Sequence, residues 1–426
     1  MKRRRTPILD PLTNMAKAFL LKLSRSRRVR LCICVTILSV TGILVSISSK
    51  PKDPCTDSDC PIREFGDRGK TILWYFVPRY VLDSPERLPL RRCPELGCYI
   101  TTNRRYLPNA HAVLMSAQQV IGNEQPARYR DQVWVYHNNE PMYLFYDKLL
   151  DEFRRSQWRS AFNWTMDFRY DSDLHRPYAK LRTRKTTVNR DYSSIVKQKT
   201  KLVAWAVSNC IDISGRLAYA RELQKYIPVD IYGRCGSGAF SRSTAEEWND
   251  YLNSTYKFYL SFESSFCTDY ISEKFFNNFN LDLVTVARGG GNYTRDAPPG
   301  TYINTADFKS PKELANQLMA LHNNDDKYIE ILKRKEKYQY VTEAYYFTTK
   351  SDILHPFSER YVEHYYEEEP MCQLCSRLHN LSGYSKTIPD ILPWVSLGKC
   401  SSAGELYSTY LLHVFSFVLT LTSSFA

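Results

Sequence analysis

Apolar and polar residues follow an α/β pattern through most of the chain. From residue 70 onward, amphipathic stretches typical of helices separate short apolar runs typical of buried strands, such as 71–77, 110–116 and 131–138. A strand, a helix and a strand are predicted in succession at 201–209, 215–227 and 229–233, which is the βαβ unit of a parallel sheet. The pattern therefore predicts an α/β fold.

Two α/β domains are predicted, one over residues 70–180 and one over residues 201–380. The segment between them, 181–200, is polar and basic and is interpreted as an interdomain linker or an acceptor-side loop. In the second domain a helix is predicted at 311–322, because Ser310 can cap it and Pro311 suits its first turn. No internal repeat is visible in the sequence.

Uncharged apolar segments lie near both ends of the chain. Residues 31–49 are nineteen residues without a charge, long enough to cross a bilayer as a helix, and the polar, proline-containing segment 50–69 reads as a stem. A cleaved signal peptide is the alternative, but the long basic leader favours a retained signal-anchor. Within the C-terminal tail, 381–426, the apolar segment 406–426 could be a second span, a GPI-attachment tail or an amphiphilic element packed on the body, and these readings stay open.

The positive charge of the chain is concentrated before the predicted span. The net charge is +13, and residues 1–30 hold ten Lys or Arg against one Asp, so 10 − 1 = +9 belongs to them and 13 − 9 = +4 to the rest. Such a tail predicts a cytosolic N-terminus and a lumenal body, a single-pass type II arrangement. Because the excess charge lies beside a membrane segment, it does not indicate a nucleic-acid partner.

Cysteines and glycosylation sequons also favour an oxidising lumen. Ten of the twelve cysteines lie beyond residue 49, an even number that suits disulfides, and the candidate partners are Cys93, Cys98, Cys210, Cys235, Cys372 and Cys375. A C-x-x-C pair can also bind zinc or perform redox chemistry, but no second such pair or His pair at zinc spacing accompanies the one at 372 and 375. Sequons occur at Asn163, Asn253, Asn292 and Asn380.

The segment 256–274, YKFYLSFESSFCTDYISEK, carries the most specific chemistry. Its alternating apolar residues predict a buried strand that ends in a polar turn, followed by a helix that begins near Asp269 and carries Glu273 and Lys274. Nucleotide ligands of open α/β sheets bind at such turns. A diphosphate needs cations, and ribose hydroxyls need an acceptor such as a carboxylate. For two isolated residues, an ordinary Glu–Lys pair on a helix surface would be the alternative. Here the nineteen residues 256–274 match, in order, a known ligand-binding signature.

This segment resembles the donor-binding signature of the α1,3-fucosyltransferases, glycosyltransferase family 10, which reads roughly YKFYLAFENS, a short gap, then DYITEK. Further family-like pieces run from about residue 72 to 379, among them CPELGCYITTNRR, WVYHNNEP and FNWTMDFRYDSDLHRPY. Several forms are most similar to the invertebrate and plant glycoprotein members. The resemblance implies a GT-B architecture, two Rossmann-like domains facing a cleft, and a Golgi enzyme that transfers L-fucose from GDP-fucose to O3 of GlcNAc in glycoprotein glycans with inversion.

The resemblance also assigns roles to individual residues. Glu140 matches the carboxylate of the family's E-S-P motif and would be the catalytic base, although the Ser of that motif is missing. Arg216 and Lys274 would contact the diphosphate. The nucleoside, ribose and fucose pockets would be lined by Tyr259, Glu263, Ser264, Tyr270 and Glu273. The alternatives from the residues alone are a solvated loop for Glu140, a surface charge for Arg216 and a core aromatic for Tyr259.

Metal dependence and two departures complete these expectations. Asp171, Ser172 and Asp173 form a D-x-D, which elsewhere binds Mn²⁺, but the family has this stretch without an obligatory metal, so no essential metal is expected, although Mn²⁺ can stimulate. The family's C-x-x-C is tied up in disulfides. Ser264 replaces a family Asn, and Thr285 replaces a Pro. These departures supply the alternative function, a weak or inactive Golgi relative that binds GDP-fucose or glycans.

Overall fold

The computed structural model describes residues 69–78, 88–90, 93–141, 146–186, 190–236, 244–342, 369–396 and 400–401. The predicted cytosolic tail, the span at 31–49 and the apolar segment 406–426 lie outside these residues, and so does the predicted stem apart from Gly69. Within the described ranges, no helix is both long and apolar enough to cross a bilayer.

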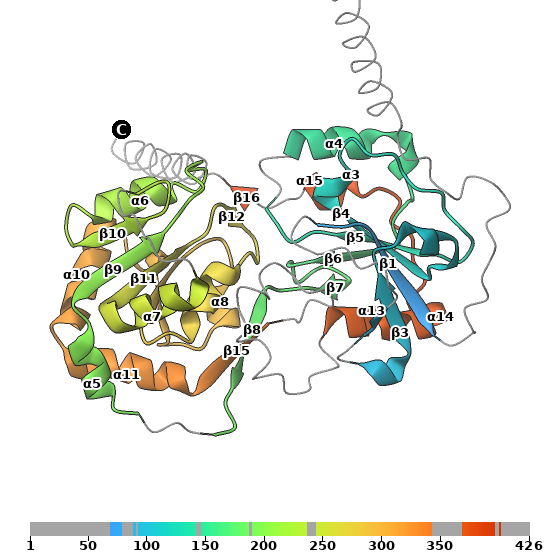
Figure 1. Cartoon of the computed structure of the whole chain (residues 1–426). Coiled ribbons are helices and arrows are strands. Elements are labelled where there is room, and N and C mark those ends of the chain that lie inside the picture. The colour runs from blue at the N-terminus through green and yellow to red at the C-terminus, as the bar shows by residue number, and fades with distance from the viewer. Residues whose placement is uncertain are drawn as a thin grey trace, which may run out of the picture. The chain divides into compact units, whose positions relative to one another are not determined.

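The first half of the described chain forms a seven-stranded sheet in the order β2-β3-β1-β4-β5-β6-β7 (Figure 1). All neighbours pair in parallel except β2 and β3. The central strands are buried along their whole length because apolar side chains on both faces are covered, as expected for a parallel sheet. The strands are β1 (Lys70–Phe76), β2 (Leu88–Pro89), β3 (Cys98–Thr101), β4 (Ala112–Ser116), β5 (Val133–His137), β6 (Trp164–Asp167) and β7 (Leu174–His175).

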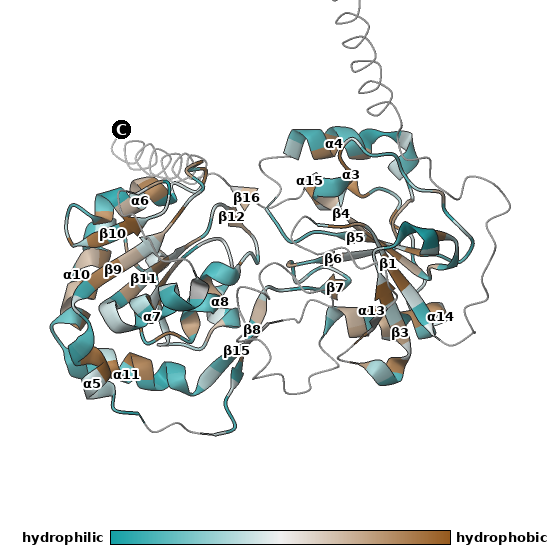
Figure 2. Ribbon diagram, viewed as in Figure 1, coloured by the Kyte–Doolittle hydropathy of each residue, from teal (hydrophilic) through white to brown (hydrophobic). Residues whose placement is uncertain are grey.

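The second sheet has five parallel strands in the order β10-β9-β11-β13-β14. Phe258, Leu260 and Phe262 of its central strand point to one face and form a core with helices α5, α6, α10 and α11. Figure 2 shows brown, hydrophobic stretches along these strands, most clearly in β10. The elements are β9 (Lys201–Ala206), α6 (Arg216–Leu223), β10 (Val229–Tyr232), α7 (Ala245–Thr255), β11 (Tyr256–Phe262), α8 (Glu273–Phe279), β13 (Val284–Arg288), α9 (Tyr293–Asp296), β14 (Tyr302–Asn304), α10 (Pro311–His322) and α11 (Asp325–Glu336).

The predicted linker 181–200 contains regular structure. It includes the end of β8 (Ala179–Thr183), which pairs antiparallel with β15 (Tyr338–Thr342), and the helix α5 (Tyr192–Gln198), whose Val196 is part of the core of the second sheet. Asp191 caps α5 by accepting a hydrogen bond from the Ser194 amide. The polar, basic sequence of this segment therefore lies on ordered elements, which the linker interpretation did not predict.

The C-terminal helices return to the first sheet, so the predicted boundary at 380 does not divide the fold. Helix α13 (Pro370–His379) contributes Met371, Leu374 and Leu378 to the core on one face of that sheet, and α15 (Leu392–Ser396) contributes Val395 to the core on the other face (Figure 1). The apolar face of α13 does not by itself indicate which of the two sheets the helix covers. The smaller elements here are α3 (Ala117–Val120), α4 (Tyr146–Arg154) and α14 (Leu381–Tyr384).

Two predicted helices of the second sheet begin or end elsewhere. Helix α8 begins at Glu273, not near Asp269, because Asp269 has a φ of 64° and Ser272 supplies the N-cap. Helix α6 ends at Leu223, whereas the prediction extended it to 227. Helix α10 is confirmed at Pro311–His322, with Ser310 accepting a hydrogen bond from the Glu313 amide.

Candidate active site

Glu263 and Lys274 meet in the loop that follows the central strand of the second sheet. The Glu263 carboxylate is 1% exposed, and it accepts hydrogen bonds from the Ser272 amide at 2.8 Å and the Ser272 hydroxyl at 2.8 and 2.9 Å. The Lys274 Nζ atom lies 3.4 Å from Glu263 Oε2, 3.2 Å from Glu273 Oε1 and 2.8 Å from Ser272 Oγ. Three of the predicted donor-side residues therefore form one charged cluster.

The main chain around Lys274 is anchored to the strand that leads into the loop. Ser261 on β11 donates a 2.7 Å hydrogen bond to the Lys274 carbonyl oxygen. Burial lowers the pKa of Lys274, but Glu263, Glu273 and Glu140 outweigh it, and the net pKa is raised. Lys274 therefore keeps its positive charge throughout the neutral range, beside a buried carboxylate whose own pKa burial raises.

Glu140 follows β5 of the first sheet and reaches the same cluster. Tyr178 donates a hydrogen bond to Glu140 Oε1 at 3.2 Å, and the Tyr270 hydroxyl lies 3.5 Å from Glu140 Oε2. Burial raises the pKa of Glu140, Glu273 and Glu263 raise it further, and Lys274 and the Tyr178 hydrogen bond oppose them. The result is a half-buried carboxylate that is more basic than an ordinary glutamate, next to the loop of the second sheet.

Arg216, Tyr259 and Ser264 occupy different environments. Arg216 is buried and donates hydrogen bonds to the carbonyl oxygens of Phe262 and Asn209, so in this structure it braces the loop after β11. Tyr259 belongs to an apolar cluster under α7, and its hydroxyl accepts a 3.4 Å hydrogen bond from the Ala206 amide, which favours the core alternative for its ring. Ser264 is half-buried directly after Glu263.

Residues that the sequence reasoning missed shape this loop. Ser272 and Ser261 hold Glu263 and Lys274. The glycines after β13 let that part of the chain pass close to the loop after β11. A Cβ on Gly290 would lie 2.5 Å from the Cys267 carbonyl oxygen, and one on Gly291 would lie 2.2 Å from the Ile271 side chain. Serines inside a known signature and a run of glycines after a strand are the signals that could have identified them.

Thr285 is a buried polar residue in the middle of the second sheet. Its side chain is 0% exposed and sits on β13 opposite Tyr259 of β11. Its Oγ1 atom has no hydrogen-bond partner among the described residues. A buried hydroxyl without a partner lowers the stability of the fold. The departure from the family proline therefore affects stability and removes no member of the charged cluster.

The D-x-D carboxylates are held apart by structural contacts. Asp171 forms a salt bridge with Arg169, whereas Asp173 accepts hydrogen bonds from the Thr165 amide and hydroxyl at 2.8 and 3.0 Å and forms a salt bridge with Lys386. Both side chains of the motif are therefore engaged in positioning the β6–β7 region and the C-terminal segment.

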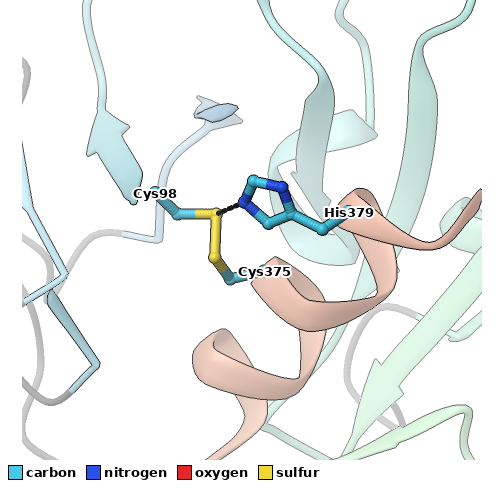
Figure 3. Close-up of side chains that lie close together, drawn as sticks. All are labelled: Cys98, Cys375 and His379. Atoms are coloured by element: carbon cyan, nitrogen blue, oxygen red, sulfur yellow. Dashed lines mark hydrogen bonds between the residues drawn. A yellow bond between two sulfur atoms is a disulfide. The ribbon is translucent and has the colours of Figure 1, made fainter. Parts of the chain in front are cut away.

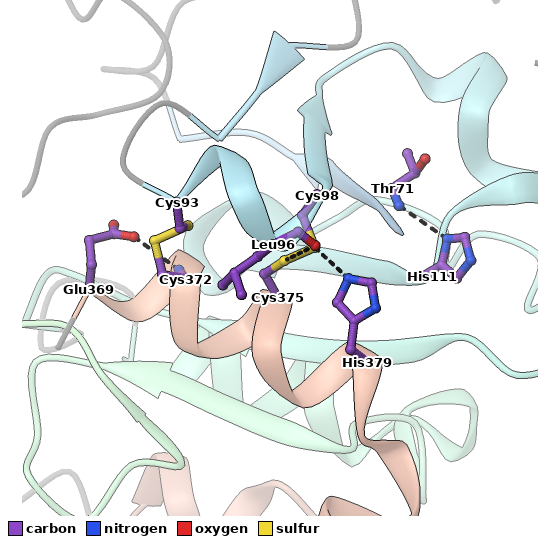
Figure 4. Close-up of a disulfide and its surroundings, with 9 residues drawn as sticks. All are labelled: Thr71, Cys93, Leu96, Cys98, His111, Glu369, Cys372, Cys375 and His379. Atoms are coloured by element: carbon purple, nitrogen blue, oxygen red, sulfur yellow. Dashed lines mark hydrogen bonds between the residues drawn. A yellow bond between two sulfur atoms is a disulfide. The ribbon is translucent and has the colours of Figure 1, made fainter. Parts of the chain in front are cut away.

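The possible metal-ligand groups in the described part of the chain are built on disulfides. One group combines Cys98 and Cys375 with His379, whose Nε2 lies 3.8 Å from Cys98 Sγ (Figure 3). The other combines Cys93, Glu369 and Cys372 (Figure 4). A sulfur atom in a disulfide has no thiolate to offer a metal, so the zinc interpretation of the C-x-x-C pair does not fit.

Four disulfides connect the described residues. All six predicted cysteines are paired, as Cys93–Cys372, Cys98–Cys375 and Cys210–Cys235. The fourth bond, Cys267–Cys400, was not predicted. It joins β12 (Phe266–Cys267) to β16 (Cys400–Ser401) and ties the loop between Glu263 and Tyr270 to the C-terminal segment.

The four sequon asparagines differ in accessibility. Asn292 and Asn380 are exposed, which suits glycan attachment. Asn163 is half-buried, and its amide nitrogen donates to the Lys386 carbonyl oxygen at 2.9 Å. Asn253 is half-buried and accepts a hydrogen bond from the Asp282 amide at 2.7 Å. Attachment at these four sites stays a prediction, with Asn292 and Asn380 the better placed.

Curated relatives of the chain are fucosyltransferases. Glycoprotein 3-alpha-L-fucosyltransferase A of Drosophila melanogaster is 35% identical over 319 residues, 73% of this chain and 57% of that protein. Alpha-(1,3)-fucosyltransferase C of the same species is 30% identical over 357 residues, 78% of this chain and 75% of that protein. The human 4-galactosyl-N-acetylglucosaminide 3-alpha-L-fucosyltransferase FUT6 is 33% identical over 279 residues, 62% of this chain and 72% of that protein. The chain thus spans little more than half of the first relative's length.

Matches to a solved structure and to family descriptions also cover more than half of the chain. A crystal structure of alpha1,3-fucosyltransferase with GDP-fucose is 17% identical with a TM-score of 0.39, over 55% of this chain and 72% of that one, a likeness too distant to add weight. Residues 67–179 match the family described as fucosyltransferase, N-terminal, and residues 196–394 match glycosyltransferase family 10 (fucosyltransferase) C-term. These two matches together span most of the chain, and the chain therefore belongs to glycosyltransferase family 10, the fucosyltransferases.

Proposed function

We propose that the protein is an α1,3-fucosyltransferase that transfers L-fucose from GDP-fucose to O3 of a GlcNAc in glycoprotein glycans, with inversion at the fucose carbon. The observation that carries the proposal is the 3.5 Å approach of Glu140 from the first sheet to Tyr270 of the second, within electrostatic reach of Glu273 and Lys274. A carboxylate and a cation near each other beyond the ends of strands from two sheets suit a reaction between an acceptor hydroxyl and an anionic leaving group. This arrangement supports the GT-B interpretation.

On the donor side, Lys274 supplies the positive charge. As the bond between fucose C1 and the diphosphate oxygen breaks, the electron pair leaves with GDP, and negative charge grows on the phosphates. Lys274 is held in place by Glu263, Ser272 and Ser261, so little reorganisation is needed when the charge develops. Glu273, half-exposed at the start of α8, is an acceptor suited to sugar or ribose hydroxyls.

On the acceptor side, Glu140 acts as the base. It takes the proton of the GlcNAc O3 hydroxyl while that oxygen forms the new bond to fucose C1, on the face opposite the departing GDP. The raised pKa of Glu140 makes it a stronger base than an exposed glutamate, and Tyr178 and Tyr270 fix its two oxygens. Attack from the opposite face of the sugar gives inversion.

A cavity of about 810 Å³ lies at the same edge of the first sheet as Glu140. It is lined where β1, β3 and β4 end, and β5, which leads to Glu140, is the next strand. Asn103, Arg104 and Gln119 line it with hydrogen-bonding groups, and the Arg104 guanidinium lies over the Tyr75 ring at 4.4 Å. Amide and guanidinium donors suit saccharide hydroxyls, so we assign this cavity to the acceptor glycan beyond the reacting residue.

The proposal includes a Golgi location, a type II membrane anchor at 31–49 and activity without an essential metal. Both carboxylates of the D-x-D already have protein partners, which supports metal independence. The test is transfer from labelled GDP-fucose by the full-length protein in solubilised membranes, with core N-glycan, lactosamine and LacdiNAc acceptors, with and without EDTA. Transfer that survives EDTA supports the proposal, whereas GDP binding without transfer to any acceptor would favour the inactive relative.

A further inference from the structure

A buried chain of hydrogen-bonded side chains lies behind the Glu140 loop. Trp74 Nε1 donates to Ser116 Oγ at 3.0 Å, and Ser116 Oγ lies 3.0 Å from His137 Nδ1. His137 Nε2 lies 2.7 Å from an Arg176 guanidinium nitrogen, which also donates to Asn139 Oδ1 at 2.7 Å. The chain therefore runs from β1 across β4 and β5 to the residue before Glu140.

Hydrogen-bonding rules fix the protonation of His137 in this chain. A guanidinium can only donate, so His137 Nε2 must accept from Arg176. A neutral ring then carries its proton on Nδ1, which points to the Ser116 hydroxyl oxygen. Burial and the positive charge of Arg176 lower the pKa of His137 well below its usual value, which agrees with a neutral ring.

The chain ends in two contacts on the Glu140 loop. Arg176 holds the Asn139 side chain, and two residues later Tyr178 donates to the Asn139 carbonyl oxygen at 2.6 Å and to Glu140 Oε1 at 3.2 Å. The amide of Arg176 itself donates to the Asp167 carbonyl oxygen at 2.7 Å, which fixes the segment to β6. One short segment, 176–178, thus contacts both Asn139 and Glu140.

We propose that Arg176 and His137 are positioning residues for the base: the neutral imidazole orients the guanidinium, the guanidinium orients Asn139, and the Asn139–Glu140 loop is thereby held with its carboxylate toward the donor loop. The inference rests on the proposed function. Trp74, His137 and Arg176 are each at most 6% exposed. A buried polar chain whose members are hydrogen-bonded holds them rigidly, and this one reaches the loop that carries Glu140.

The first test separates positioning from folding in the full-length protein. In Arg176→Lys the shorter side chain falls short of the position where one guanidinium nitrogen contacts both His137 and Asn139, and His137→Leu removes the acceptor. We therefore expect kcat to fall about 10²-fold in each variant while KM for GDP-fucose stays unchanged. His137→Gln keeps an acceptor toward Arg176 and should recover most of kcat. The control is Arg128→Gln at the opposite edge of the same sheet, where the more exposed Arg128 guanidinium also donates to an Asn side chain.

The second test uses the pH profile, which a purely structural role would not move. The hydrogen bond from Tyr178 lowers the pKa of Glu140, against the raising effects of burial, Glu273 and Glu263 and alongside the lowering effect of Lys274. Tyr178→Phe should therefore shift the acid limb of kcat to higher pH. If wild type transfers fucose while Arg176→Lys and His137→Leu leave kcat unchanged, or lower it no more than Arg128→Gln does, this inference alone is wrong. Failure of wild type to transfer to any acceptor would overturn the proposed function as well.

Discussion

The two halves of the site hold their carboxylates with different chemistry. On the donor side, Glu263 and Lys274 form a charged pair, and the Ser272 hydroxyl hydrogen-bonds to both of them. On the base side, hydroxyl and amide groups hold Glu140. Of the titratable residues behind it, His137 has a lowered pKa and Asp167 a raised pKa, so both neutral forms are favoured. The first environment suits a fixed positive charge beside a diphosphate, and the second suits a carboxylate that must accept a proton.

The difference also explains which half is visible in the sequence. A charged cluster needs Glu, Lys and Ser at set positions along one strand, loop and helix, so it leaves a contiguous signature at 256–274. The hydrogen-bonded chain behind Glu140 draws residues from β1, β4, β5 and the segment after β7, and so it leaves no local pattern.

Loss of the donor-side cation should have the largest effect on the donor side. Lys274→Gln is expected to lower kcat/KM for GDP-fucose about 10²–10³-fold, because the cation that faces the leaving group is removed. The variant also leaves Glu263 buried without its partner, so its thermal midpoint should drop. Adding Glu263→Gln should restore the midpoint but not the rate, and recovery of both by the double variant would argue that Lys274 is structural only.

Breaking the disulfide of the donor loop should come next. Cys267→Ser with Cys400→Ser is expected to destabilise the protein by about 2–4 kcal/mol and to raise KM for GDP-fucose, because the bond ties the loop between Glu263 and Tyr270 to β16. The matched control, Cys98→Ser with Cys375→Ser, should cost similar stability without changing that KM, since it lies on the first sheet. Equal effects on KM would contradict the local role of Cys267–Cys400.

Asp167 should give the base side a distinctive pH dependence of stability. Burial raises the pKa of Asp167 from 3.8 to about 7, and Asn138 and Arg169 oppose the rise. The folded state therefore keeps a proton that the unfolded state loses, and the contribution of this group to stability falls as pH rises from about 4 to about 7 and levels off above that. Asp167→Asn should gain stability relative to wild type between pH 5 and pH 8, measured as the difference in thermal midpoints. A difference that is constant with pH would be inconsistent with this titration.

The smallest expected effect concerns the buried hydroxyl of the second sheet. Thr285→Val keeps the side-chain shape and removes an Oγ1 atom that has no hydrogen-bond partner among the described residues. The variant should be more stable by about 1–2 kcal/mol with unchanged transfer, as judged by the thermal midpoint and kcat. A loss of activity in Thr285→Val would mean that this hydroxyl contributes to the site.

Local sequence was enough to predict the parts of the fold that are built from neighbouring residues. The βαβ unit around β9, α6 and β10, the capped helix α10 and the strand–turn–helix of the donor loop all depend on short-range periodicity and capping. Even there, the start of α8 was misplaced because the side chain of Ser272 caps it while Asp269 adopts a positive φ. Helix boundaries depend on such single contacts.

Contacts between distant segments could not be predicted. The return of α13 and α15 to the first sheet and the Cys267–Cys400 bond join residues more than a hundred positions apart, and an amphipathic stripe does not say which sheet it covers. For the candidate site, the family motif brought Glu140, Glu263, Glu273 and Lys274 to notice. The supporting Ser272, Tyr178 and Arg176 emerge only when the two sheets and their crossover segments are placed in space.

The most direct test of the central claim is the kcat of Glu140→Gln with GDP-fucose and a GlcNAc-terminated glycan, measured beside Glu273→Gln and with GDP binding as the control. If Glu140 is the base, Glu140→Gln should lose about 10²–10⁴-fold in kcat while binding GDP as wild type does, and Glu273→Gln should retain more of the rate. A Glu140→Gln variant that transfers fucose at the wild-type kcat would contradict the account.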